Sequence, residues 1–280
     1  MKKAHMARGA AALCATAILF LLFCYLLFPA AKIDALLAQV LSRQGLKLTP
    51  VVHKTLLPVG LAWNNPVLSS EQGALLRCER FQGRLQLLPL LAGRAVIVGS
   101  AIIGGGHLDA TYALNGKAAF KLDAEGISLS DIPFFNSVLK AKAAGMLWSQ
   151  GTLRREAKGL DGELKIAVTQ LELSGVKLGA FPLPDTSNLK TQGKIRVSEG
   201  KARLESFTLE GDGVYMRLSG DIPTGANAAA SPLNMSLEIM PKPEFLEKQK
   251  LVFMLLSKFM TSPGVYMVPI RGTLLKPEIL

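Results

Sequence analysis

The hydrophobic pattern begins with an uncharged stretch, Ala10–Phe28, which no later segment of the chain resembles. Wound as a helix, these 19 residues rise about 28 Å. The hydrocarbon core of a bilayer is about 30 Å thick, so the stretch is long enough to span it. The pattern therefore predicts a transmembrane helix over residues 10–29, which holds the rest of the chain beside a membrane.

The charges before this stretch predict its orientation. The flank, residues 1–9, contains Lys2, Lys3 and Arg8 and no acid. Because positive charge favours the cytoplasmic side of a span, we expect a single-pass protein of a bacterial inner membrane, with a cytoplasmic N-terminus and a periplasmic body. The alternative is a cleaved signal peptide, whose apolar core runs about 7–15 residues and ends at an A-x-A-like site. The sequence after Phe28 fits such a site poorly, and we favour an uncleaved anchor.

Residues 30–45 change to a helical pattern. The apolar side chains that recur at helical spacing are Ile33, Leu36, Leu37, Val40 and Leu41. Gly45 is well placed to end the helix, since glycine accepts the left-handed conformation after a last turn. The segment is predicted to be a short amphipathic helix that packs on the body or rests at the membrane surface.

Residues 46–240 follow a period of two, which is typical of half-buried strands. Leu108, Ala110, Tyr112 and Leu114 alternate with the residues between them, up to a hairpin signal at Asn115-Gly116. Leu164, Ile166 and Val168 alternate in the same way, and Leu171 and Leu173 continue in the shifted phase. A shift of one residue predicts a bulge or a strand break.

Glycines punctuate the later runs and are interpreted as closely spaced turns between many short strands: Gly162, Gly175, Gly193, Gly200, Gly211, Gly213 and Gly220. The prediction is an elongated, curved antiparallel β-sheet body, mainly β with a few short helices. Residues 181–184 and 225–232 are breaks rich in proline or small residues. The first could divide the body into two β domains, but we favour a continuous sheet.

Residues 241–280 are predicted to complete the body with a helix and a terminal strand. The helix is placed at Glu244–Met260, after Pro243, which suits a first helical position. It is interpreted as a plug over one end of the sheet, with a membrane-binding or partner-binding helix as the alternative. The strand is placed at Val265–Leu274.

Charge narrows the classes of partner. The chain has 32 Lys and Arg and 21 Asp and Glu, and the flank holds three of the bases, so the body carries 29 bases against 21 acids and a net charge of +8. Such a surface attracts anionic lipid headgroups or acidic partners, although we favour the solvated polar face of a sheet. The bases are scattered and few aromatic residues lie among them, so nucleic acid is not expected as a partner.

Candidate chemistry is sparse. The histidines, His5, His53 and His107, have no nearby acidic or cysteine pattern, and the common catalytic motifs are missing from the sequence. Gly104-Gly105-Gly106 lacks the lysine of a phosphate loop and is interpreted as a turn or a bulge. Glu210 and Asp212 are explained by turn chemistry rather than by a cation.

The cysteines agree with this interpretation. Cys14 and Cys24 fall in the predicted span, and Cys78 is alone in the body, so neither an intrachain disulfide nor a zinc site is expected. We therefore expect no enzyme, no catalytic or metal-binding residue and no cofactor.

Two segments carry a family resemblance. LQLLPLLAGR at Leu85–Arg94, followed by IIGGGHL at Ile102–Leu108, resembles the LxLxPLLxGR…GGxL stretch of AsmA-like periplasmic proteins. VPIRGTLLKPEI at Val268–Ile279 resembles their PxxGTLxxPxI ending. With the single anchor and the chain length, the whole resembles the type II secretion system protein N family. This resemblance implies a non-enzymatic, inner-membrane accessory subunit that binds other subunits of the secretion machine.

A second function follows from the same patterns. An amphipathic sheet must cover its apolar face with a second sheet, with helices, or by curling into a groove that holds an acyl chain. The AsmA-like stretch makes an AsmA-like lipid-binding or lipid-transfer module, with phospholipid as its ligand, the alternative to the secretion subunit.

Overall fold

The computed structural model describes residues 30–49, 53–56, 59–178, 181–211, 213–225 and 227–279. The predicted flank and transmembrane helix, residues 1–29, lie outside these ranges. Within them, no helix combines the length and the apolar composition that crossing a membrane requires.

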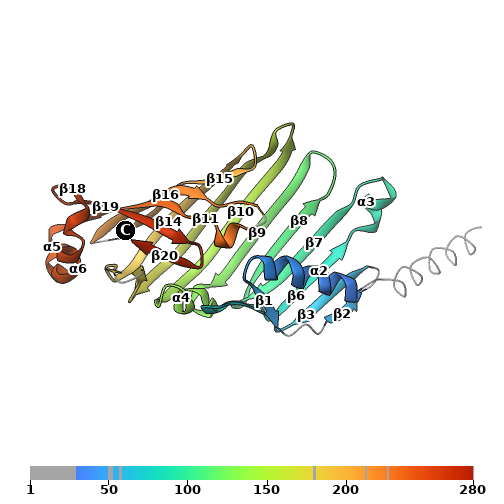
Figure 1. Cartoon of the computed structure of the whole chain (residues 1–280), viewed down its shortest axis with the longest axis horizontal. Coiled ribbons are helices and arrows are strands. Elements are labelled where there is room, and N and C mark those ends of the chain that lie inside the picture. The colour runs from blue at the N-terminus through green and yellow to red at the C-terminus, as the bar shows by residue number, and fades with distance from the viewer. Residues whose placement is uncertain are drawn as a thin grey trace, which may run out of the picture.

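One antiparallel sheet of 15 strands forms most of the described chain. Its order is β18-β19-β17-β16-β15-β14-β11-β10-β9-β8-β7-β6-β3-β2, with β20 paired to β19. The strands follow one another along the long axis of the molecule, and each strand runs across that axis (Figure 1). Their bounds are β2 His53–Leu56, β3 Gly60–Asn64, β6 Arg80–Leu85, β7 Val96–Ile103, β8 Gly106–Ala113, β9 Ala118–Ser128, β10 Lys142–Glu156, β11 Gly159–Ser174, β14 Thr186–Ser198, β15 Lys201–Glu210, β16 Val214–Ile222, β17 Asn234–Pro241, β18 Met260–Ser262, β19 Val265–Thr273 and β20 Lys276–Ile279.

Two small sheets and several short helices complete the fold. The small sheets are β1 (Lys47–Thr49), β4 (Val67–Ser70) and β5 (Gly73–Arg77), and β12 (Lys177–Leu178) with β13 (Phe181–Pro182). The helices are α2 Ala30–Arg43, α3 Leu87–Leu91, η1 Leu129–Asp131, α4 Phe134–Ser137, η2 Ala228–Ala230, α5 Pro243–Lys248, α6 Lys250–Leu255 and η3 Ser257–Phe259. The predicted mainly β body with a few short helices is therefore confirmed.

Several local predictions are confirmed. The helix predicted after the span is α2, and Gly45 has the expected left-handed backbone, with φ of +71°. The phase shift after Val168 is a bulge, where Gln170 has φ of +53° and the pairing with β14 resumes at Leu171. Gly104 and Gly105 form the turn between β7 and β8.

The prediction of short strands fails for three central strands, because β10, β11 and β14 have 15, 16 and 13 residues. Gly162, Gly193 and Gly220, interpreted as turns, lie inside strands. At Gly193 the reason is a close approach, since a Cβ atom there would lie 2.4 Å from Cδ2 of Phe207 on the next strand. The sheet is also continuous across the proline-rich break, because β11 and β14 pair directly on either side of it.

The C-terminal prediction needs two corrections. The helix predicted over Glu244–Met260 is divided into α5, α6 and η3, and β19 is followed by a further strand, β20. The first division falls at Gln249, whose side-chain Oε1 accepts the backbone N–H of Asp185 at 3.0 Å. Its Nε2 donates to the Asp185 carbonyl at 2.6 Å. This contact holds Gln249 in a non-helical conformation, with φ of −120° and ψ of 33°.

We expect Gln249→Ala to lower the free energy of unfolding by about 1–2 kcal/mol, because two backbone groups lose their partner. The measurement is thermal or denaturant unfolding of the full chain in detergent. Gln192→Ala, at an exposed position of β14, is the matched control and should change little. Equal stability of the two variants would show that the contact does not fix the C-terminal helices.

Candidate functional site

One face of the large sheet is apolar along its whole length. Residues that lie directly opposite each other on neighbouring strands point to the same face. The pairings join one such row from β3 to β19, consisting of Trp63, Phe81, Ala101, Leu108, Ala124, Ser149, Ile166, Gly193, Phe207, Leu218, Leu237 and Val268. Ser149 is the one polar residue in this row.

The hydroxyl groups of Ser149 and Thr191 on this face are bonded within the sheet. Ser149 Oγ donates to the Lys165 carbonyl at 3.0 Å. Thr191 Oγ1 donates to the Val168 carbonyl at 3.2 Å and accepts the Val168 N–H at 2.7 Å. Both hydroxyls thus satisfy backbone partners instead of facing outward. The chemistry of this surface suits an apolar ligand.

The opposite face is charged. Glu163 and Lys194 form an ion pair at 2.7 Å, and Arg196 pairs with Glu205. The hydrogen bond and charge of Lys194 lower the pKa of the Glu163 carboxyl. Charged side chains therefore gather on the solvated side of the sheet, which leaves the apolar side to be covered by other means.

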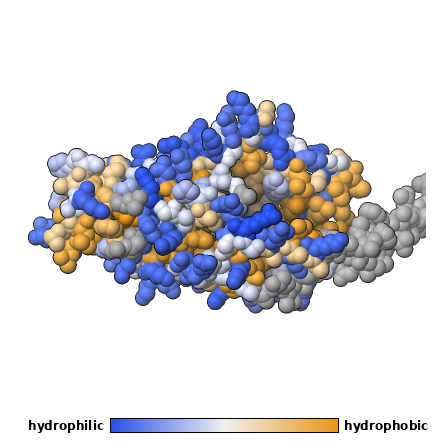
Figure 2. All heavy atoms as spheres, viewed as in Figure 1, coloured by the Kyte–Doolittle hydropathy of each residue, from blue (hydrophilic) through white to orange (hydrophobic). Residues whose placement is uncertain are grey.

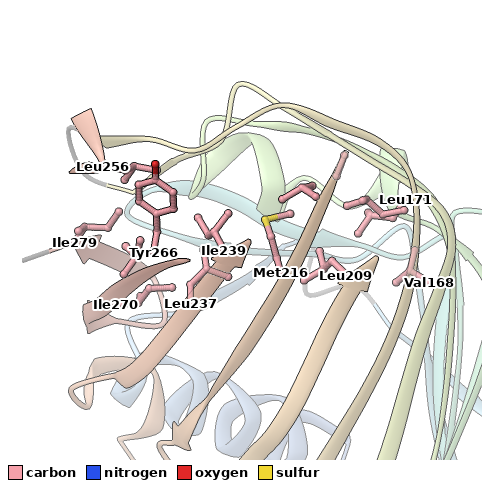
Figure 3. Packing of buried hydrophobic residues seen from close by; sticks show 14 of the residues in the cluster. Val168, Leu171, Leu209, Met216, Leu237, Ile239, Leu256, Tyr266, Ile270 and Ile279 are labelled. Atoms are coloured by element: carbon pink, nitrogen blue, oxygen red, sulfur yellow. The ribbon is translucent and has the colours of Figure 1, made fainter. Parts of the chain in front are cut away.

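Helices cover the apolar face at both of its ends. At the C-terminal end, Phe253 and Leu256 are 3% and 0% exposed, and the Phe253 ring lies 5.1 Å from that of Tyr266. Figure 3 shows Leu256 and Tyr266 in this cluster. This packing fits the predicted plug. The outer side of the same segment nevertheless exposes Leu251, Met254 and Leu255, and Figure 2 shows hydrophobic residues gathered at this end of the molecule.

At the N-terminal end, α2 packs through Leu37 and Leu41. Together with Leu48 and Trp63 they line an apolar cavity of about 300 Å³ between the helix and the sheet. Leu36 and Val40, on another side of α2, are exposed. The last turn after α2 reaches the loop between β16 and β17, where Gln44 Oε1 accepts the N–H of Ala229 at 3.1 Å. This contact joins segments 185 residues apart.

The middle of the apolar face is only half-buried. We call this part the central strip and define it by Leu108, Leu122, Leu153, Leu164, Ile166, Ile195, Phe207 and Leu218. Two cavities border the sheet along one rim, with volumes of about 870 and 530 Å³. Their lining combines residues of the apolar face, such as Ala143 and Leu189, with charged residues, such as Arg77 and Glu244. Partly open apolar surface beside mixed polar openings is an arrangement suited to an amphipathic ligand.

The residues considered for chemistry do not form a catalytic site. His107 is exposed on the polar face, His53 lies in β2, and Glu210 is exposed at the end of β15. His5, Cys14, Cys24 and Asp212 lie outside the described residues. Among the described residues, no group of three His, Cys, Asp or Glu side chains could hold a metal ion.

Cys78, whose location the sequence left open, is a buried free thiol. It packs with Ala101, Ile103, Ala124 and Ile127 in the smaller core cluster. Desolvation by burial raises the pKa of the thiol. A buried thiol held in its neutral form acts as a small apolar side chain rather than as a nucleophile.

The fold and the apolar face thus define a protein built on one long antiparallel sheet whose open surface offers apolar contact. No family model, curated protein or solved structure matches the chain. Its function is therefore inferred from its own geometry.

Proposed function

We propose that the chain is a non-enzymatic lipid-binding protein, in which the central strip forms the floor of a groove that holds an acyl chain. The observation that carries this proposal is the row from Trp63 to Val268, in which every residue except Ser149 is apolar and the Ser149 hydroxyl is bonded to the backbone. In this proposal, residues 10–29 are the transmembrane tether, and the elongated, curved body stands on the periplasmic side of the inner membrane.

The test is cross-linking of the full chain to a phospholipid that carries a photoactivatable group in its acyl chain. We expect cross-links on peptides of β11, β15 and β16, which contain Ile166, Phe207 and Leu218. Lipid around the tether would label residues 10–29 alone, so the position of the cross-link separates the two sources. Labelling confined to residues 10–29, with no lipid-modified peptide from the β body in the mass spectrum, would reject the proposal.

A second candidate is the accessory subunit of a type II secretion machine, in line with the resemblance at residues 85–94 and 268–279. The feature that favours it is the edge of the sheet at β18, whose three residues are all exposed. Exposed strand edges can pair with a strand of a partner. Co-purification of secretion subunits with the full chain, lost when Thr261 is replaced by proline at this edge, would support it. Unchanged export after deletion of the gene would count against it.

A further inference from the structure

The short helix α3 exposes large apolar side chains at the tip of the β6–β7 connection. Leu88 and Leu91 are 82% and 80% exposed, and Leu90 is 43% exposed. Exposed side chains continue from it along the ends of β7 and β8. We call this surface the α3 patch and define it by Leu88, Leu90, Leu91, Ile97, Tyr112 and Leu114. Hydrophobic residues gather at this end of the molecule in Figure 2.

Hydrogen bonds to the neighbouring turn hold this tip in place. The Asn115 side chain accepts the N–H of Ala95 at 3.1 Å and donates to the Gly93 carbonyl at 2.7 Å. The guanidinium of Arg155 in turn donates to the Leu114 carbonyl at 3.0 Å. The leucines are therefore presented outward by a fixed platform. Surface of this kind marks a site that is covered in use.

Bases outnumber acids in the turns around the α3 patch. The charged residues that flank α3 are Arg84 and Arg94, and the sequence from Arg80 to Leu108 contains no acid. The next turn on this rim adds Lys117, and the turn between β10 and β11 adds Arg154, Arg155 and Lys158. The acids there are Glu156, Asp161 opposite Arg154, and Glu199, which pairs with Lys158 at 3.4 Å. Exposed leucines beside an excess of bases complement an anionic lipid surface, which offers acyl chains below a layer of negative headgroups.

Two further observations indicate which lipid surface this is. The described chain begins with α2, at the same end of the sheet as α3 (Figure 1), directly after the uncharged stretch Ala10–Phe28. The patch also runs into the apolar face, since Ile97 lies opposite Tyr112, and Tyr112 lies opposite Phe120. Phe120 then lies opposite Leu153 of the central strip. The part of the patch on β7 and β8 is thus continuous with the strip.

We propose that the α3 patch inserts into the anionic face of the membrane that tethers the chain, and that it is the entrance through which lipid reaches the central strip. The part that concerns lipid passage rests on the proposed function. The membrane contact stands on the exposure and charge of the patch.

The test uses the full chain reconstituted in vesicles that contain phosphatidylglycerol and phospholipids brominated in the acyl chain. Leu88→Trp places a fluorophore on the patch, and Met267→Trp places one at an exposed site of β19, at the other end of the sheet. The fluorescence of the native Trp63 and Trp148 is measured in the unsubstituted chain and subtracted from that of each variant. We expect the bromines to quench most of the added fluorescence of L88W and to leave M267W unquenched, with less quenching of L88W in phosphatidylcholine alone.

A second measurement follows the transfer of a fluorescent phospholipid from vesicle to protein. Replacing Leu88 and Leu91 together by glutamate should slow the transfer about tenfold, because charged side chains enter the membrane less readily. A tenfold change corresponds to a barrier raised by about 1.4 kcal/mol. The same double change at Leu251 and Met254 of α6 is the control and should leave the rate unchanged.

The outcomes separate this inference from the proposed function. L88W without quenching, or M267W quenched equally, would overturn the membrane contact, whether or not the strip binds lipid. Quenching of L88W without cross-links on the strip would leave the contact standing and reject the groove. Equal slowing by the α3 and α6 changes would overturn the assignment of the entrance.

Discussion

Replacing Ile166 by glutamate is expected to remove lipid from the central strip. Ile166 lies in the middle of the apolar row, opposite Ser149 on one side and Gly193 on the other. These small neighbours leave its side chain as the main apolar contact at this point. An ionised carboxylate facing an acyl chain would lose its hydration without gaining a partner, which costs several kcal/mol.

The expected result is a fall of about 100-fold in the lipid affinity of the full chain, equivalent to roughly 3 kcal/mol. The measurement is recovery of the photo-cross-link on peptides of β15 and β16, with circular dichroism to confirm that the variant keeps its strands. Gln192→Glu adds the same charge to the polar face of the adjacent strand and is the matched control. Ile166→Ala removes only apolar contact and should weaken binding less than Ile166→Glu does.

If I166E is folded and still cross-links at the level of Q192E, the acyl chain does not lie on this face. If both variants lose lipid, the added negative charge weakens binding on either face of the sheet, and the strip has no special role. The comparison therefore tests the side of the sheet that binds lipid, which is the central point of the proposal.

The features that could be predicted from the sequence are those fixed by neighbouring residues. The helix over residues 30–45, the bulge after Val168 and the turn at Gly104-Gly105 each depend on a local signal: helical spacing, a phase shift and adjacent glycines. Period-two alternation also predicted that one face of the sheet would be apolar.

The features that escaped prediction depend on residues far apart in the sequence. The division of the C-terminal helix at Gln249 comes from contact with Asp185, 64 residues earlier. Gly193 looked like a turn because the side chain that fills its space, Phe207, belongs to the next strand. The apolar row itself depends on the register of every pair from β3 to β19, and a shift by one residue would turn a strand's apolar side chains to the other face.

The exposure of the α3 patch also could not be predicted from neighbouring residues. The leucines at residues 87–91 were recognised only as part of a family-like stretch, and nothing local distinguishes a buried leucine run from an exposed one. Their exposure follows from the position of α3 at a rim of the sheet, beside a turn that Asn115 and Arg155 hold in place. The sequence did contain one usable signal, the absence of any acid from Arg80 to Leu108.

Gly106→Ala is expected to destabilise the sheet strongly, although Gly106 has an ordinary strand conformation. A Cβ atom at this position would lie 2.4 Å from the carbonyl carbon and oxygen of Gly126 and from the nitrogen of Ile127. These are backbone atoms of β9, and a flexible side chain is not available to move aside. The strand would have to shift, and with it Ile127, which is 2% exposed in the cluster around Cys78.

Overpacking of this kind costs about 3 kcal/mol at the upper end of its usual range. For a body of this size, such a loss lowers the unfolding temperature by roughly 10 °C. The matched control is Gly105→Ala in the adjoining turn, where φ is +73° and the space around a Cβ atom is open. That change should cost only about 1 kcal/mol of backbone strain. Equal losses would mean that the turn conformation, and not the contact between β8 and β9, is what requires glycine here. A larger loss for Gly106→Ala would show that the close approach of β8 and β9 requires glycine here and keeps Ile127 in the core.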